Sequence, residues 1–188
     1  MSLKIIDPHV HFFNLVEGQY SWLQGANPPA WPNLEKIKQP VSAQQLVQNT
    51  DFELVGLVHI EAGFDNISPI NELNWLSSHL KSLSFKAISY TQIDSSADQF
   101  INSLDALAHL SLCGIRDITE GSDAKRLLDA NSFKNLTTLS DTRLYFEAQF
   151  DIENGEITKQ IAYYAKQLPQ LQIIINHAGL PSNLNTWQ

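Results

Sequence analysis

The chain has 188 residues, of which 43% are hydrophobic and 17% charged, a globular composition with enough apolar residues to bury a core. Its net charge of -8, with only 12 Lys+Arg and no basic cluster, argues against binding to nucleic acid or to an anionic membrane surface. Cys113 is the single cysteine, so no internal disulfide can form, and no apolar run reaches signal-peptide or membrane-spanning length. We therefore expect a cytoplasmic protein folded as one domain over 1–188.

The first predicted strand begins at Leu3 and leads directly into Asp7, His9 and His11. Because strand side chains alternate between two faces, His9 and His11 share a face, with Cα atoms about 6.6 Å apart. Two imidazoles at this spacing can bind one divalent cation, and Asp7 can act as a further ligand or orient a histidine. The alternative is a solvated strand end. The position at the end of the first strand of a βα series favours a functional site.

The segment 12–41 is predicted to be a long irregular first βα loop, because prolines recur in it. The aromatic residues Tyr20, Trp22 and Trp31 favour an ordered lid over a flexible linker. Tyr20 and Trp22 could either contact a substrate or pack this loop down onto the fold. Ser42 and Gln45 match a capping box, which predicts a helix to about Asn49.

Apolar runs predict five further strands, at 54–62, 85–90, 112–117, 144–150 and 171–177. Helical periodicity predicts helices at 70–83, 101–107 and 157–168, with helical turns around 127–128 and 133–139. This alternation predicts an α/β fold with a parallel sheet and right-handed crossovers. Since no Gly-rich phosphate loop follows the first strand, a (β/α)8 TIM barrel is favoured over a dinucleotide-binding sheet, with only about six βα units present.

Polar side chains gather at the carboxyl ends of the predicted strands, where barrel enzymes place their chemistry; they are His9, His11, Glu61, Arg116, Gln149 and His177. Glu61 could be a ligand or base at the barrel mouth, or a member of a structural ion pair. Arg116 could contact substrate or pair with Asp117 or Glu147. His59 lies deeper in its strand and is interpreted as a hydrogen-bonded core residue.

The motif Ile-Asp-Pro-His-Val-His-Phe-Phe at 6–13 resembles the opening of the amidohydrolase-related family (amidohydrolase family 2) of metal-dependent hydrolases. Further segments resemble, in the same order, the branch that contains sugar-acid lactonases and the pyrone-dicarboxylate lactonase; they lie at 20–23, 58–62, 114–116 and 175–181. The resemblance covers essentially the whole chain and implies an eight-stranded barrel, which this chain would contain in C-terminally truncated form.

The resemblance implies roles for the residues that match its motifs. His9, His11 and His177 would be catalytic groups and, together with Glu61, candidate ligands of one divalent ion, zinc or manganese. In a metal-independent alternative the imidazoles themselves would polarise the substrate carbonyl. The remaining matches imply substrate contacts by Arg116, Trp22 and Tyr20, and Gln149 is a further candidate because it lies at the carboxyl end of the predicted fifth strand. The family's general base, an aspartate ending the eighth strand, has no counterpart in the sequence.

The activity implied is attack of water on the carbonyl of a sugar-derived or carboxylated lactone. Two alternatives remain open: a catalytically inactive truncated remnant that binds metal or ligand as an oligomer, and a metal-dependent decarboxylase of the same superfamily. Six strands would leave the first and the sixth without a neighbour. We therefore expect a homo-oligomer, or a further C-terminal segment that covers these strands.

Overall fold

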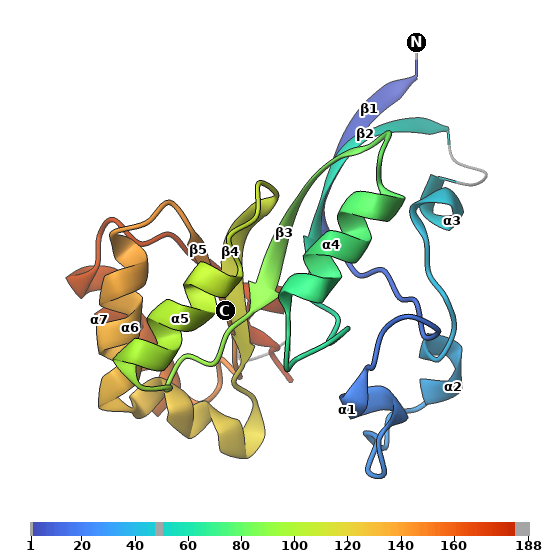
Figure 1. The fold of residues 1–188 in the computed structure, drawn as a ribbon. Coiled ribbons are helices and arrows are strands. Elements are labelled where there is room, and N and C mark those ends of the chain that lie inside the picture. The colour runs from blue at the N-terminus through green and yellow to red at the C-terminus, as the bar shows by residue number, and fades with distance from the viewer. Residues whose placement is uncertain (1, 48–50, 183–188) are drawn as a thin grey trace. The chain divides into compact units, whose positions relative to one another are not determined.

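The computed structural model describes residues 2–47 and 51–182 (Figure 1). The chain divides into two compact units, each described here by itself. The first unit comprises Met1–Tyr90 with Leu107–Leu112, and the second comprises Thr91–Ala106 with Cys113–Gln188. In the described part of the chain no helix is both long and apolar enough to cross a membrane.

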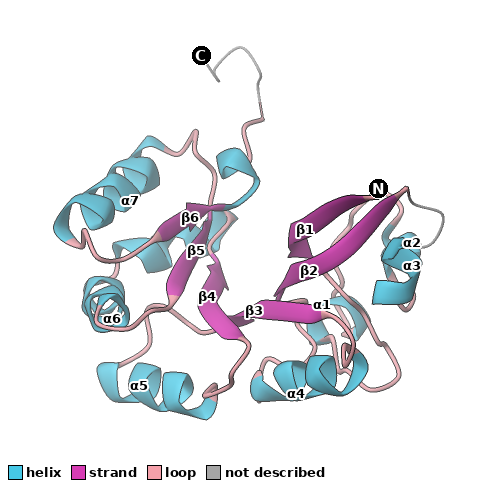
Figure 2. Cartoon of the chain, turned by 90° about the horizontal axis from the view of Figure 1, so that it is seen from above, coloured by secondary structure: helices cyan, strands magenta, loops and turns pink. Residues whose placement is uncertain are grey.

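The first unit is built on three parallel strands, β1 (Leu3–Val10), β2 (Phe52–Ile60) and β3 (Ser84–Tyr90), which lie side by side in Figure 2. Helix α4 (Ile70–His79) connects β2 to β3 and buries Leu73 and Leu76. The connection from β1 to β2 contains three short helices: α1 (Ser21–Gln24), α2 (Leu34–Ile37) and α3 (Ala43–Val47). The expected end of the last of these helices, at Asn49, lies outside the described residues.

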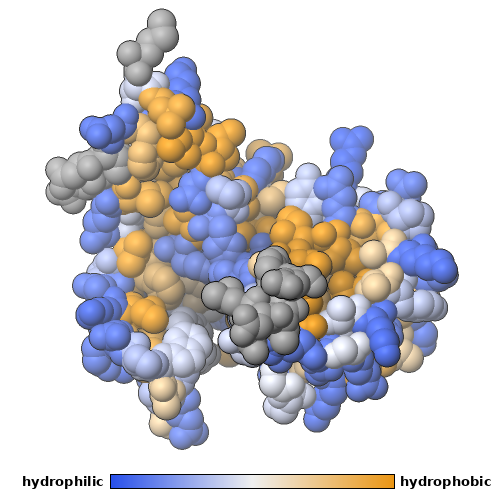
Figure 3. Space-filling model, turned by 180° about the vertical axis from the view of Figure 1, so that it is seen from behind, coloured by the Kyte–Doolittle hydropathy of each residue, from blue (hydrophilic) through white to orange (hydrophobic). Residues whose placement is uncertain are grey.

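Strand β1 forms an edge of the first unit, because its ladder runs to β2 alone among the described residues. Leu3 is 69% exposed and Ile6 is 65% exposed, although both are large apolar residues. Figure 3 shows hydrophobic surface at the upper left, over the β1–β2 end of this unit. Among the described residues, β1 is therefore an apolar edge strand, as the sequence predicted for the first strand.

The second unit contains β4 (Leu112–Ile118), β5 (Tyr145–Gln149) and β6 (Ile173–Ile175), which are also parallel. Helices α5 (Ala97–Ala106), α6 (Ala130–Ser140) and α7 (Gly155–Gln167) lie together on one side of these strands (Figure 2). Two 3₁₀ segments, η1 (Gly121–Leu128) and η2 (Asn176–Gly179), follow β4 and β6.

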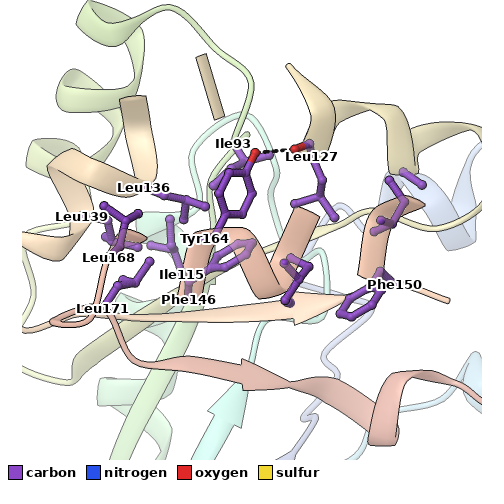
Figure 4. Close-up of a cluster of buried hydrophobic side chains, with 14 of the residues drawn as sticks. Ile93, Ile115, Leu127, Leu136, Leu139, Phe146, Phe150, Tyr164, Leu168 and Leu171 are labelled. Atoms are coloured by element: carbon purple, nitrogen blue, oxygen red, sulfur yellow. Dashed lines mark hydrogen bonds between the residues drawn. The ribbon is translucent and has the colours of Figure 1, made fainter. Parts of the chain in front are cut away.

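A continuous apolar cluster holds the second unit together (Figure 4). Phe146 on β5 and Leu136 on α6 are fully buried in this cluster, and each such side chain contributes about 1.5–3 kcal/mol by leaving water. The Tyr164 hydroxyl, on α7, donates a hydrogen bond to the Leu127 carbonyl oxygen within the cluster. Helix α7 and η1 are thus tied together through a buried polar contact as well as by packing.

The strands follow one another in the order β1 to β6 and alternate with helices, so the predicted α/β class with six βα units is confirmed. The eight-stranded barrel is an expectation that residues 2–47 and 51–182, with their six strands, do not test. The sixth strand was predicted too long: β6 covers only Ile173–Ile175, because just these residues pair with Phe146–Ala148 of β5.

Candidate functional site

His9 and His11 form a pair at the carboxyl end of β1. Their Nε2 atoms lie 3.1 Å apart, and the two rings meet edge to face with centroids 5.0 Å apart. Both side chains are partly exposed. The shared face expected from strand alternation is therefore present, and the two nitrogens converge on one point.

Backbone contacts hold the two histidines in this arrangement. Asp7 Oδ1 accepts a hydrogen bond from the His9 backbone N–H at 3.1 Å, so the carboxylate orients the backbone at His9. His11 Nδ1 lies 2.9 Å from the Ile60 carbonyl oxygen. Because a carbonyl can only accept, the proton of the His11 ring is on Nδ1, which leaves the Nε2 lone pair directed at His9.

The pair fits the geometry of a divalent cation site. Zinc bound by two imidazoles at about 2.0–2.1 Å in a tetrahedral arrangement requires the two nitrogens to be roughly 3.3 Å apart, which is close to the 3.1 Å observed. A ring held through Nδ1–H to a backbone carbonyl is the usual form of a histidine ligand. Within the described residues no group of three or more His, Cys, Asp or Glu gathers at one cation position.

Glu61 follows β2 directly and is 4% exposed. Its Oε2 atom accepts a hydrogen bond from the Gly63 backbone N–H at 2.9 Å. Gly63 has φ +72°, a conformation that favours glycine and lets the chain turn back toward the carboxylate. The structure thus gives Glu61 a role in shaping this turn, and its role as a ligand or base stays a prediction.

The loop after β1 is ordered and packed against residues 62–64. Tyr20 is fully buried, and its hydroxyl accepts a hydrogen bond from the Asn14 backbone N–H at 2.9 Å. Burial of this hydroxyl raises the pKa of Tyr20 well above its ordinary value. Trp22 Nε1 donates to the Ala62 carbonyl oxygen at 2.8 Å. Both side chains therefore pack the loop down onto the fold, and contact of either with a substrate stays a prediction.

A second polar group lies at the carboxyl ends of β4 and β5. Arg116, 4% exposed, donates through Nη1 to Gln149 Oε1 at 3.0 Å and lies 3.6 Å from Glu147 Oε1. The ion-pair interpretation of Arg116 with Glu147 is thus confirmed. Asp117 pairs with Arg126 instead, at 2.7 Å. Contact of Arg116 or Gln149 with a substrate remains a prediction.

His177 lies beyond the sixth strand, in η2, and is exposed. The expectation that it ends the strand was therefore wrong. Its φ of +47° belongs to the left-handed region, which costs a residue with a Cβ about 1 kcal/mol or more. The turn is held in place because the Ile152 backbone N–H donates to the Gly179 carbonyl oxygen at 2.7 Å. The shared site of His177 with His9 and His11, which belong to the first unit, stays a prediction.

Sequence reasoning missed three participants. Asn176 is buried and donates through Nδ2 to Gln149 Oε1 at 2.9 Å. Glu120 accepts from Gln149 Nε2. In the first unit Glu72, in the first turn of α4, pairs with the buried His59. Each of these contacts joins residues distant in the chain, so local spacing gave no signal for Asn176, Glu120 or Glu72.

Comparison with known proteins identifies the fold. No protein-family model matches the chain. The uncharacterized protein y4mH of Sinorhizobium fredii is 24% identical over 203 aligned residues, which cover 100% of this chain and 67% of that protein.

Several solved structures resemble the chain, and they include amidohydrolases. An amidohydrolase 2 from Bifidobacterium longum subsp. infantis has a TM-score of 0.69 and 18% identity, covering 97% of this chain and 65% of that one. A zinc-bound amidohydrolase from Burkholderia multivorans has a TM-score of 0.66 and 13% identity, with 93% and 57% covered. A Pseudomonas putida protein provisionally named a 2-pyrone-4,6-dicarboxylic acid hydrolase has a TM-score of 0.55 and 17% identity, with 96% and 59% covered.

The chain therefore spans roughly two thirds or less of the length of these solved proteins. Over 97% of its own length, the chain has a fold similar to part of the amidohydrolase 2 from Bifidobacterium longum subsp. infantis.

Proposed function

We propose that this chain carries the reaction centre of a hydrolase that opens a sugar-derived or carboxylated lactone. The observation that carries the proposal is the convergence of His9 Nε2 and His11 Nε2 at 3.1 Å, with His11 oriented through Nδ1 by the Ile60 carbonyl. The amidohydrolase fold supports the reaction class, and the similarity to a protein named as a pyrone-dicarboxylate hydrolase supports the choice of a lactone.

His9 and His11 would hold one divalent ion, zinc or manganese, with His177 as the proposed third ligand and Glu61 as a further candidate. When bound, such an ion would polarise the carbonyl and acidify water. In the absence of metal, a proton on His9 Nε2 would be donated to His11 Nε2, so that the two rings share one proton across the 3.1 Å between these nitrogens. A bound cation would displace this proton, whereas in the metal-independent route the proton would be donated to the substrate's carbonyl oxygen.

The reaction consists of attack by the oxygen of water on the lactone carbonyl carbon, followed by cleavage of the ring C–O bond. The leaving oxygen takes up a proton, and the product is a hydroxy acid that releases one proton to neutral solution. In a metal-independent route the His9 Nε2–H would donate to the oxygen that becomes negative. Arg116 and Gln149 are proposed to contact polar groups of the substrate, because their planar donors suit carboxylate and hydroxyl oxygens.

The test is acid release from a panel of lactones, including 2-pyrone-4,6-dicarboxylate and aldonolactones, with chelated protein and with added zinc or manganese. We expect hydrolysis that falls about 100-fold or more in His9→Asn and His11→Asn, the usual scale for losing a group that stabilises the oxyanion. The matched control is His79→Asn, on the exposed end of α4, which should retain full activity. Release of CO2 without net ring opening would instead indicate the decarboxylase, and acid release that survives both histidine variants would contradict the proposal.

A further inference from the structure

A histidine–carboxylate pair lies buried in the first unit, where it contacts the residue that follows His11. His59 on β2 is fully buried and Glu72 on α4 is 3% exposed. Glu72 Oε1 accepts from His59 Nε2 at 2.9 Å and from the Ala62 backbone N–H at 2.9 Å. Burying a carboxylate and an imidazole is costly unless both are hydrogen-bonded, and these contacts meet that requirement.

One end of this pair reaches the residue that follows His11. His59 Nδ1 accepts a hydrogen bond from the Phe12 backbone N–H at 3.4 Å, and the His59 ring stacks on the Phe12 ring with centroids 5.8 Å apart. Because an N–H group faces Nδ1, that nitrogen has no proton, and the proton of the His59 ring is on Nε2. Glu72 is the acceptor that keeps it there.

Glu72, the other member of the pair, holds the backbone on both sides of the Ile60 carbonyl group, which orients His11. Ile60, whose oxygen accepts from His11 Nδ1, lies next to His59 and two residues before Ala62. Glu72 Oε1 binds the side chain of His59 on one side of Ile60 and the backbone of Ala62 on the other. A single carboxylate oxygen therefore fixes the end of β2 on both sides of the group that determines the tautomer of His11.

We propose that Glu72 and His59 are positioning residues that hold His11 with its proton on Nδ1 and its Nε2 lone pair directed at His9. Glu72 acts on His59 and on residues 60–62, and these in turn hold the backbone at Phe12 and the ring of His11. The inference rests on the proposed function only for the statement that His9 and His11 form the reaction centre. The placement of the protons can be measured without any substrate.

The first test is the ¹⁵N imidazole NMR spectrum of the whole chain, labelled in histidine and freed of metal. At about pH 8.5 a histidine of ordinary pKa, about 6.5, is neutral, so each ring reports its tautomer. We expect His11 to be protonated at Nδ1 and His59 at Nε2, with signals assigned by their loss in His11→Asn and His59→Asn. A His59 ring protonated at Nδ1 would overturn the proposal, because it could not accept from Phe12.

The second test asks whether the pair controls His11 or only stabilises the fold. Glu72→Ala removes the shared acceptor, whereas Glu72→Gln retains an oxygen at that position. We expect Glu72→Ala to shift His11 toward a mixture of tautomers and Glu72→Gln to restore the single Nδ1–H form. Asp65→Ala is the matched control, because Asp65 is a buried carboxylate that binds the backbone N–H groups of Ile67 and Ser68 before α4 without touching His59.

If Glu72→Ala folds and its His11 signals are unchanged, the Glu72–His59 pair only stabilises the fold, and the proposal is overturned. If Glu72→Ala does not fold, His59→Gln takes its place, because its amide N–H can donate to Glu72 while the ring nitrogen Nδ1 that accepts from Phe12 is lost. Unchanged His11 signals there would overturn the proposal equally. Since these spectra need no substrate, failure of lactone hydrolysis would leave this test intact.

Discussion

Asp117 couples the stability of the second unit to pH. It is 1% exposed, accepts from the Ile93 backbone N–H through Oδ2 at 3.0 Å, and binds Arg126 through Oδ1 at 2.7 Å. Burial raises the pKa of Asp117 to about 6 from 3.8, although Ile93 and Arg126 act to lower it. The folded chain thus favours the protonated form. The resulting stabilisation is complete below about pH 3.8 and is lost as the pH rises through about 6.

We therefore predict that the wild-type protein loses about 3 kcal/mol of stability as the pH rises from about 3 to about 7, and that Asp117→Asn abolishes this loss. The asparagine oxygen can still accept from Ile93, but the side chain does not ionise. Urea unfolding of the two proteins across this pH range measures the difference. Parallel stability curves for wild type and variant would contradict the assignment.

At the scale of single residues, the sequence predicted side-chain pairs that are close in the chain. It missed pairs whose members come together only in the folded structure. His9 and His11 could be paired because strand alternation puts them on one face. The Tyr20 hydroxyl binds a residue six positions away in the chain, and Glu72 binds His59, 13 positions away. Helical or strand periodicity does not reveal contacts at these separations. His177 was placed wrongly because the ladder between β5 and β6 ends at Ile175.

Among the elements, the loop after β1 depends on one glycine. A Cβ added at Gly63 would lie 2.6 Å from Trp22 Cδ1 and Nε1, and the φ of +72° is itself unfavourable for alanine. We predict that Gly63→Ala destabilises the first unit by at least 1 kcal/mol and displaces the Trp22 ring, which shifts tryptophan fluorescence. Gly155→Ala, at the start of α7 with open space around it, is the matched control and should be neutral or slightly stabilising. Equal melting temperatures for the two variants would contradict this account of the loop.

The start of a helix could be predicted where the sequence contains a recognisable capping motif. Ser42 and Gln45 form the predicted capping box: the Ser42 N–H donates to Gln45 Oε1 at 2.7 Å and the Gln45 N–H donates to Ser42 Oγ at 3.4 Å. Asp65, which accepts from Ser68 and Ile67, was not recognised as the group that organises the start of α4. Its role depends on the turn at residues 65–68, which spacing alone does not define.

For the whole molecule, the exposed edge of β1 predicts self-association. Leu3 and Ile6 are largely exposed, and in the second unit Ile174 and Ile175 of β6 are 41% and 44% exposed. Apolar edge strands with unpaired backbone groups are templates for pairing with another chain. We predict that residues 1–188 elute as an oligomer in size-exclusion chromatography with light scattering, and that Ile6→Lys shifts the population toward monomer. A wild-type chain that runs as a monomer of 21.2 kDa would contradict this prediction.

The central claim is that His9 and His11 act as one ligand pair, and calorimetric titration of metal-free protein with zinc tests it most directly. We predict one zinc per chain, with release of the proton held between the two Nε2 atoms, seen as a dependence of the heat on the ionisation enthalpy of the buffer. Binding should be lost in His11→Asn and retained in His79→Asn. The absence of zinc binding by the wild-type chain, or binding that persists in His11→Asn, would contradict the claim.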